Sequence, residues 1–211
     1  MKHLQLSTHD GHATLTFDRE GSSANIFDFD TLNQLIDALT QIENDVSINS
    51  LQIRSNKPSI FIAGADIHEL MASTPGELAA MIDLGHEAFQ LLEDLHIPTI
   101  ASIHGACLGG GYELALACDW RIASDDKCTK IGLPETKLGN LPAWGGSTRL
   151  PLLIGLTQAL PLVLGGKVLS ANGAKIKKLI DDVVPKEHLD RVAKQFLSKG
   201  KREKPNHPVQ H

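Results

Sequence analysis

Three consecutive glycines, Gly109–Gly111, stand directly before an apolar segment that contains a single carboxylate, Glu113. Glycine tolerates positive φ and lets the backbone come close to its neighbours, so this run predicts a tight turn with bare peptide N–H groups at a helix start. The residues that follow, Leu114–Ala117, are apolar. A carboxylate among them is costly to bury unless it is paired, protonated or functional, and a solvent-facing position is the alternative interpretation.

A second carboxylate, Glu135, follows Pro134 in the segment Ile131–Gly146. By itself it is equally consistent with an exposed loop acid. The pair is more informative, because two carboxylates in one small site allow one to accept a proton while the other donates one. With peptide N–H groups to hold a developing oxyanion, the two segments favour acid–base chemistry on a carbonyl compound.

A third segment, Ala63-Gly64-Ala65-Asp66, falls where a strand-like run turns into a helix-like one. Its small side chains would expose the N–H of Ala65, although a tight packing turn would need the same residues. Asp66 suits the N-cap of the following helix equally well.

Strand-like and helix-like segments alternate along the chain, which is typical of the α/β class. We expect one domain over residues 1–198 and a charged, proline-broken tail or linker over residues 199–211. The expected strands cover residues 3–18 (a hairpin turned at Asp10–Gly11), 50–54, 60–62, 99–103, 120–123 and 179–184. The expected helices cover residues 31–42 (with Thr31 as N-cap), 77–95, 113–117, 147–164 and 185–199.

Composition and motifs exclude several classes of function. A formal net charge of -5 argues against a nucleic-acid partner. Three cysteines without a Cys-x-x-Cys pair indicate reduced thiols and a cytoplasmic protein. No apolar run reaches the roughly 18 residues that a membrane span needs. The sequence has no His-Glu-x-x-His, Gly-x-Gly-x-x-Gly or Walker A pattern, so we expect neither a metal nor a nucleotide cofactor.

Three motifs together carry a family resemblance: residues 61–67 (FIAGADI), 103–113 (IHGACLGGGYE) and 132–146 (GLPETKLGNLPAWGG). They resemble the enoyl-CoA hydratase/isomerase (crotonase) superfamily, and most of all the N-terminal hydratase region of multienzyme fatty-acid β-oxidation alpha subunits. The resemblance runs from about residue 10 to residue 190. It implies an α/β crotonase-like (ClpP/crotonase) spiral of ββα units, here with a shortened helical C-terminal part.

The resemblance also implies roles for the site residues. The backbone N–H groups of Ala65 and Gly110 would hold the thioester oxyanion, Glu113 would activate the water that attacks C3, and Glu135 would exchange the proton at C2. Relatives with other chemistry commonly lack one acid, so the presence of both favours hydration of trans-2-enoyl-CoA. A Δ3–Δ2 enoyl-CoA isomerase remains an alternative, and so does an inactive acyl-CoA-binding or assembly fragment.

Further residues are implied to line the substrate. Trp144 stands where many relatives carry a small residue or Phe, and it would reshape the acyl pocket. Coenzyme A would follow residues 61–67 as part of the substrate rather than as a cofactor, with Lys57 or Arg54 near its phosphates. The implied lining residues are Ala63, Gly64, Asp66, Ile67, Gly109, Pro134, Pro142 and Trp144.

The implied partners are an enoyl-CoA thioester and other protein chains. Family resemblance suggests a homotrimer, or assembly with a β-oxidation thiolase or dehydrogenase. Free-standing relatives continue with further C-terminal helices. The sequence is therefore compatible both with a natural short protein and with a part of a larger alpha subunit.

Overall fold

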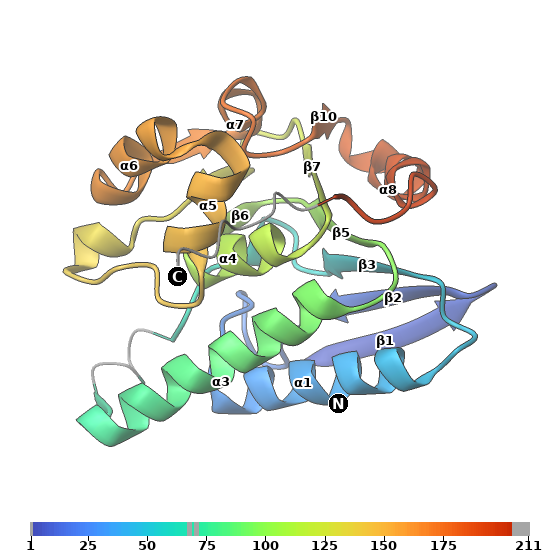
Figure 1. Cartoon of the computed structure of the whole chain (residues 1–211), viewed down its shortest axis with the longest axis horizontal. Helices are drawn as coiled ribbons and strands as arrows, with labels where there is room; N and C mark the ends of the chain where they lie inside the picture. The colour runs from blue at the N-terminus through green and yellow to red at the C-terminus, as the bar shows by residue number, and fades with distance from the viewer. Residues whose placement is uncertain (1, 67–68, 70–71, 204–211) are drawn as a thin grey trace, which may run out of the picture.

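The computed structural model describes residues 2–66, 69 and 72–203, and its larger sheet has six strands in the order β1-β2-β3-β5-β7-β10 (Figure 1). β1 and β2 are antiparallel and form the predicted hairpin, with Asp10 and Gly11 both at positive φ. The other neighbouring pairs run parallel. The strands are β1 (Leu4–His9), β2 (His12–Phe17), β3 (Ser50–Ser55), β5 (Thr99–Ile103), β7 (Trp120–Ser124) and β10 (Asp182–Val184).

A second sheet has four short strands in the order β4-β6-β8-β9. Consecutive strands of the chain alternate between the sheets: β3, β5 and β7 join the larger one, and β4, β6 and β8 join the smaller one. A helix follows each such pair, so the fold is the α/β spiral of ββα units that the sequence predicts. The strands are β4 (Ile60–Ile62), β6 (Ala106–Leu108), β8 (Lys130–Gly132) and β9 (Val168–Ser170).

Two long helices, α1 (Phe29–Asn44) and α3 (Pro75–Asp94), lie side by side beneath the larger sheet (Figure 1). Asp28, not Thr31, caps α1: its carboxylate accepts the Thr31 N–H at 2.8 Å, so the predicted cap is wrong by three residues. α3 begins with a capping box at Thr74. α8 (Leu189–Leu197) packs separately against residues of β5 and β7.

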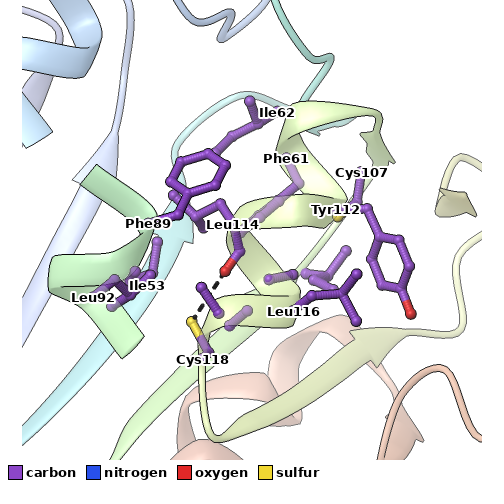
Figure 2. Packing of buried hydrophobic residues seen from close by; sticks show 14 of the residues in the cluster. Ile53, Phe61, Ile62, Phe89, Leu92, Cys107, Tyr112, Leu114, Leu116 and Cys118 are labelled. Atoms are coloured by element: carbon purple, nitrogen blue, oxygen red, sulfur yellow. Dashed lines mark hydrogen bonds between the residues drawn. The ribbon is translucent and has the colours of Figure 1, made fainter. Parts of the chain in front are cut away.

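The short helix α4 (Gly110–Ala117) lies in the middle of the molecule, and every one of its residues is buried. Figure 2 shows Phe89 and Leu92 of α3 on one side of this helix and Tyr112 pointing away on the other. The Tyr112 hydroxyl donates to the carbonyl of Leu179 at 3.0 Å. The apolar flanks of Glu113 are therefore core residues, and the solvent-facing alternative for this segment is wrong.

The C-terminal third is more broken than the sequence predicts. Gly155, with φ 84, separates α5 from α6, so the single helix expected over residues 147–164 is two helices. Helix α7 and the three-residue strands β6, β8 and β9 were not expected, because such short elements carry no periodicity. The remaining elements are α5 (Gly146–Ile154), α6 (Leu156–Leu164), α7 (Ala171–Ile176), and the 3-10 helices η1 (Glu135–Leu138) and η2 (Lys186–His188).

The segment expected to be a charged tail begins with residues that contact the domain. The Arg202 side chain pairs with Asp181, and its backbone N–H donates to Asp119 at 3.3 Å. The Lys199 ammonium lies 3.7 Å from the ring centroid of Phe196. The domain boundary at residue 198 stays a prediction. In the part of the chain that the structure describes, no helix is long and apolar enough to cross a bilayer.

Candidate active site

The N-terminus of α4 is built by a sharp glycine turn. Gly109 has φ 54, and its N–H donates to the Gly132 carbonyl at 3.0 Å. A Cβ atom on Gly111 would lie 2.3 Å from the Ile62 carbonyl oxygen, so the helix presses directly on β4. The first N–H groups of a helix have no partner within it. The triple glycine therefore brings the first N–H groups of α4, including that of Gly110, to a close-packed turn.

The turn at residues 63–66 is fixed by a bridge between Phe27 and Ala65. The Phe27 N–H donates to the Gly64 carbonyl at 2.8 Å, and the Asp66 N–H donates to the Phe27 carbonyl at 2.9 Å. Because the C=O and the N–H of one trans peptide point in opposite directions, and the Gly64 carbonyl faces Phe27, the Ala65 N–H faces away from this bridge.

The two predicted oxyanion turns lie against each other. A Cβ atom on Gly64 would lie 3.2 Å from the Leu108 carbonyl oxygen and 3.6 Å from the Gly110 nitrogen. Gly64 is at φ 102, which disfavours a side chain for a second reason. Ala63 is exposed, so this turn leads from the surface to the buried start of α4.

Glu113 lies in the first turn of α4 and is 2% exposed. Its Oε1 accepts hydrogen bonds from the backbone N–H groups of Trp144, at 2.9 Å, and Gly146, at 2.8 Å. Burial raises the pKa of Glu113 to about 7, and repulsion from Glu135 adds to this while the two N–H groups oppose it. The carboxyl is thus held in one place and titrates near neutrality.

Glu135 begins η1, directly after Pro134. Both of its carboxylate oxygens are buried, and neither has a hydrogen-bond partner among the described residues. A Cβ atom on Gly109 would lie 3.0 Å from Glu135 Oε1, so the carboxylate adjoins the glycine turn. Burial raises the pKa of Glu135. The exposed-loop interpretation of this residue is wrong.

The Trp144 side chain is only 4% exposed and packs beside the start of α4. Its ring meets Phe27 and Phe89 edge-on, with centroids 5.6 and 5.7 Å away. A Cβ atom on Gly85 would lie 2.2 Å from Trp144 Nε1, and one on Gly110 would lie 2.5 Å from Cζ3. The two glycines therefore make the space that the indole fills.

The other predicted lining residues are placed with less detail. Asp66, in the turn at residues 63–66, and Pro134, directly before η1, are half-buried. Pro142 is buried, and its carbonyl accepts the Ser147 hydroxyl at 3.2 Å. Ile67 lies outside the described residues.

The two cations suggested for the coenzyme A phosphates already have partners. Lys57 Nζ lies 2.7 Å from an Asp18 carboxylate oxygen and is largely buried. Arg54 pairs with Asp190 at 3.2 Å. The buried ion pair argues against a phosphate-binding role for Lys57, whereas the role of Arg54, in an exposed and therefore weak pair, stays a prediction. Within the described ranges, no three His, Cys, Asp or Glu side chains gather in a way that could hold a metal ion.

Sequence reasoning missed the groups that hold Glu113. The Trp144–Gly146 turn supplies two N–H donors, and Arg149 braces it by donating to the Trp144 carbonyl at 2.9 Å. Arg149 also binds Glu93 of α3, with Nε 2.7 Å from the carboxylate. The adjacent glycines at 145 and 146 were a visible signal of a turn, but nothing local indicates which side chain it serves.

Comparison with known proteins defines the class. The family model for enoyl-CoA hydratase/isomerase matches residues 8–211. This chain therefore belongs to the enoyl-CoA hydratase/isomerase family.

Among curated relatives, the chain is similar to the fatty acid oxidation complex subunit alpha of two bacteria. It is 51% identical to that of Vibrio vulnificus (strain CMCP6) over 163 residues, which are 77% of this chain and 23% of the relative. It is 45% identical to that of Shewanella sp. (strain MR-4) over 194 residues, which are 92% of this chain and 27% of the relative. The chain thus spans about a quarter of the length of these relatives.

Solved structures place the fold in the same family. The enoyl-CoA hydratase of Bacillus anthracis superposes with a TM-score of 0.87 at 32% identity, covering 93% of this chain and 76% of that one. Pseudomonas aeruginosa DspI gives a TM-score of 0.87 at 31% identity, covering 94% of this chain and 80% of that one. The crotonase fold implied by the sequence motifs is confirmed.

Proposed function

We propose that this chain catalyses the reversible addition of water to a trans-2-enoyl-CoA, which gives a 3-hydroxyacyl-CoA. One observation carries the proposal: two buried carboxyl groups with raised pKa values, Glu113 and Glu135, adjoin the glycine turn that begins α4. Carboxyl groups with pKa values raised above the ordinary range suit general acid and general base roles. Membership of the enoyl-CoA hydratase/isomerase family supports the same reaction class.

In the proposed mechanism, the thioester oxygen accepts hydrogen bonds from the Ala65 and Gly110 N–H groups. Attack at C3 moves the electron pair of the double bond toward C2 and builds enolate charge on this oxygen. Preorganised donors stabilise that charge, and one such donor is worth about 3 kcal/mol in comparable sites.

The two acids divide the proton transfers. Ionised Glu113 takes a proton from water as the hydroxyl oxygen bonds to C3, and protonated Glu135 gives a proton to C2. The hydrogen bonds from Trp144 and Gly146 fix the Glu113 carboxylate for this role. The net change is one water added across the double bond, and return of the proton from Glu113 to Glu135 through solvent restores the starting state.

This division predicts a bell-shaped dependence of kcat/KM on pH. Activity requires one carboxyl ionised and the other protonated, so it falls both when the pair is fully protonated and when it is fully ionised. Because the two groups repel each other, the apparent pKa values of the acidic and alkaline limbs describe the pair and cannot be assigned to one residue each. A steady-state profile between pH 5 and 9 measures both limbs, and a flat profile would contradict the mechanism.

The first test is the loss of the conjugated enoyl-thioester absorbance when the purified chain meets crotonyl-CoA. We expect turnover by the wild type and a rate about 10²- to 10⁴-fold lower for Glu135→Gln and for Glu113→Gln. Glu87→Gln, at an exposed position on α3, is the matched control. Unchanged turnover in both site variants would rule the mechanism out.

A Δ3–Δ2 enoyl-CoA isomerase activity is the second candidate. It is favoured by Glu135, whose oxygens have no hydrogen-bond partner among the described residues, since one such carboxylate beside the glycine turn suffices to carry a proton between two carbons. Glu113→Gln separates the reactions: hydration of a 2-enoyl-CoA should fall strongly, and isomerisation of a 3-enoyl-CoA should not.

A non-catalytic acyl-CoA-binding role is the third candidate, with the chain acting as part of a larger assembly. The relatives are named as subunits of a fatty acid oxidation complex, and the chain spans about a quarter of them. We propose a homotrimer, or association with a thiolase or dehydrogenase, as the working assembly. Calorimetric binding of an acyl-CoA without turnover on any enoyl-CoA would favour this role, and ultracentrifugation measures the assembly state.

A further inference from the structure

The indole of Trp144 fills the interior next to the candidate carboxylates. Its backbone N–H donates to Glu113, and its six-membered ring lies against Gly110. On its other edges it meets Phe27, Phe89 and Gly85, which closes the space toward α3.

The direction of a bound acyl thioester follows from burial. The bulky, charged coenzyme A part must stay near the surface, where the turn at residues 63–66 begins with exposed Ala63. The reacting carbons must reach the buried carboxylates of Glu113 and Glu135. Any further carbons of the acyl chain then lie deeper than the two carboxylates, and the Trp144 ring packs beside Glu113 between the start of α4 and α3.

We propose that Trp144 closes the inner end of the acyl site and restricts this chain to short acyl thioesters, such as the four-carbon crotonyl group. The inference rests on the proposed function, because it takes the Glu113–Glu135 site to be the acyl-CoA site. Two grooves of about 620 and 630 Å³ open elsewhere on the described residues. Neither is lined by Glu113, Glu135 or Trp144, so neither extends this site inward.

The environment of the indole nitrogen favours Phe as a substitute for Trp144. Trp144 Nε1 is buried and has no hydrogen-bond partner among the described residues. A buried donor without an acceptor is unfavourable, so exchange for Phe removes that cost together with part of the ring. Trp144→Phe is therefore the variant expected to keep the fold, while Trp144→Ala opens the larger space.

The test compares binding of saturated acyl-CoAs, which does not depend on turnover. Calorimetry with butyryl-CoA and decanoyl-CoA gives a ratio of the two Kd values for each protein. We expect the wild type to bind butyryl-CoA roughly 10- to 100-fold more tightly than decanoyl-CoA, as steric discrimination in apolar pockets commonly gives. Trp144→Ala should bring the ratio to one or reverse it, and Trp144→Phe should fall between.

Trp120→Phe is the matched control, because Trp120 stacks on Phe196 away from the carboxylates. It should leave the ratio unchanged. Circular dichroism and the melting temperature identify variants that fail to fold. If Trp144→Ala does not fold, Trp144→Phe and the wild-type ratio still decide the matter.

The outcomes separate this inference from the proposed function. Equal affinity of the wild type for both ligands would overturn the length limit, even if crotonyl-CoA is hydrated. A ratio that Trp144→Phe and Trp144→Ala leave unchanged would overturn it too. A ratio that shifts as expected without crotonyl-CoA turnover would support the length limit and count against the hydratase. No binding of either ligand by the wild type would overturn both.

Discussion

Glu113 and Glu135 adjoin the same glycine turn, yet the α4 region and the η1 region present them differently. The α4 region buries Glu113 completely and meets one of its oxygens with two backbone N–H groups. The η1 region buries both oxygens of Glu135 and offers them no partner among the described residues. A carboxylate held by the backbone has a fixed position, whereas an unpartnered one keeps its hydrogen-bonding capacity for a ligand. The fold thus fixes the Glu113 carboxylate in position and leaves the Glu135 carboxylate able to hydrogen-bond a ligand.

Among changes that leave both carboxyl groups in place, the largest expected effect comes from displacing Glu113. A Cβ atom at residue 146 would lie 2.9 Å from Glu113 Cγ and 3.0 Å from Oε1. We expect Gly146→Ala to lower the hydration rate about 10²- to 10³-fold, because the carboxylate must leave the place that catalysis requires. Assays on crotonyl-CoA measure this. Gly76→Ala, where a Cβ atom meets nothing within 4 Å, is the control. A rate within twofold of the wild type would mean that the position of Glu113 is unimportant.

The second prediction concerns the dependence of stability on pH. Burial raises the pKa of Glu113 from 4.5 to about 7, so the folded chain holds a proton that the unfolded chain releases between these values. Stability therefore falls as pH rises through this interval. Glu113→Gln cannot ionise, and we expect it to gain about 3 kcal/mol relative to the wild type at pH 8. The gain should vanish near pH 4.5.

Urea unfolding at the two pH values measures this difference. Glu135→Gln should shift in the same direction, because burial also raises the pKa of Glu135. A pH-independent difference between wild type and Glu113→Gln would show that Glu113 titrates normally.

The smallest expected effect comes from loosening the brace behind Glu113. Arg149 connects the Trp144 carbonyl to Glu93, so Arg149→Gln should free the turn that donates to Glu113. Loss of the cation also removes an interaction that lowers the pKa of Glu113. We expect a roughly 10-fold lower kcat, which is the size of effect that one ion-pair contact contributes. We also expect the low-pH limb of the activity profile to move to higher pH. Arg191→Gln, at an exposed position on α8, is the control. Equal effects of the two substitutions on kcat would show that Arg149 does not help to position Glu113.

Local signals predicted much of the fold. The Asp10–Gly11 turn and the flanking alternation specified the first hairpin, and the apolar stripes specified α1 and α3. The cap of α1 was misplaced because Asp28 and Thr31 are both good caps, and the structure uses the first. Strands of three residues are defined by their neighbours in the smaller sheet, so no local pattern could reveal them.

The candidate site also has a part that the sequence predicted and a part that only the structure shows. The family motifs predicted Glu113, Glu135 and the two glycine turns, and the structure brings these residues together. Sequence could not indicate that Trp144 and Gly146 supply the donors to Glu113, because these contacts join segments far apart in the chain. The same holds for the packing of Trp144 on Gly85, which only the position of α3 decides.

The space around Trp144 has a consequence for how such a protein can change by mutation. Cβ atoms on Gly85 and Gly110 would both fall inside the indole ring's van der Waals envelope, at 2.2 and 2.5 Å. A tryptophan introduced at position 144 while residue 85 or 110 still carried a side chain would clash with that side chain. Loss of the tryptophan causes no such clash. The three positions are therefore epistatic, and the order of their substitutions is constrained in one direction. Under the proposed chain-length limit, a single substitution of Trp144 would broaden the range of acyl chains, whereas a return to narrow specificity would also require glycine at both positions.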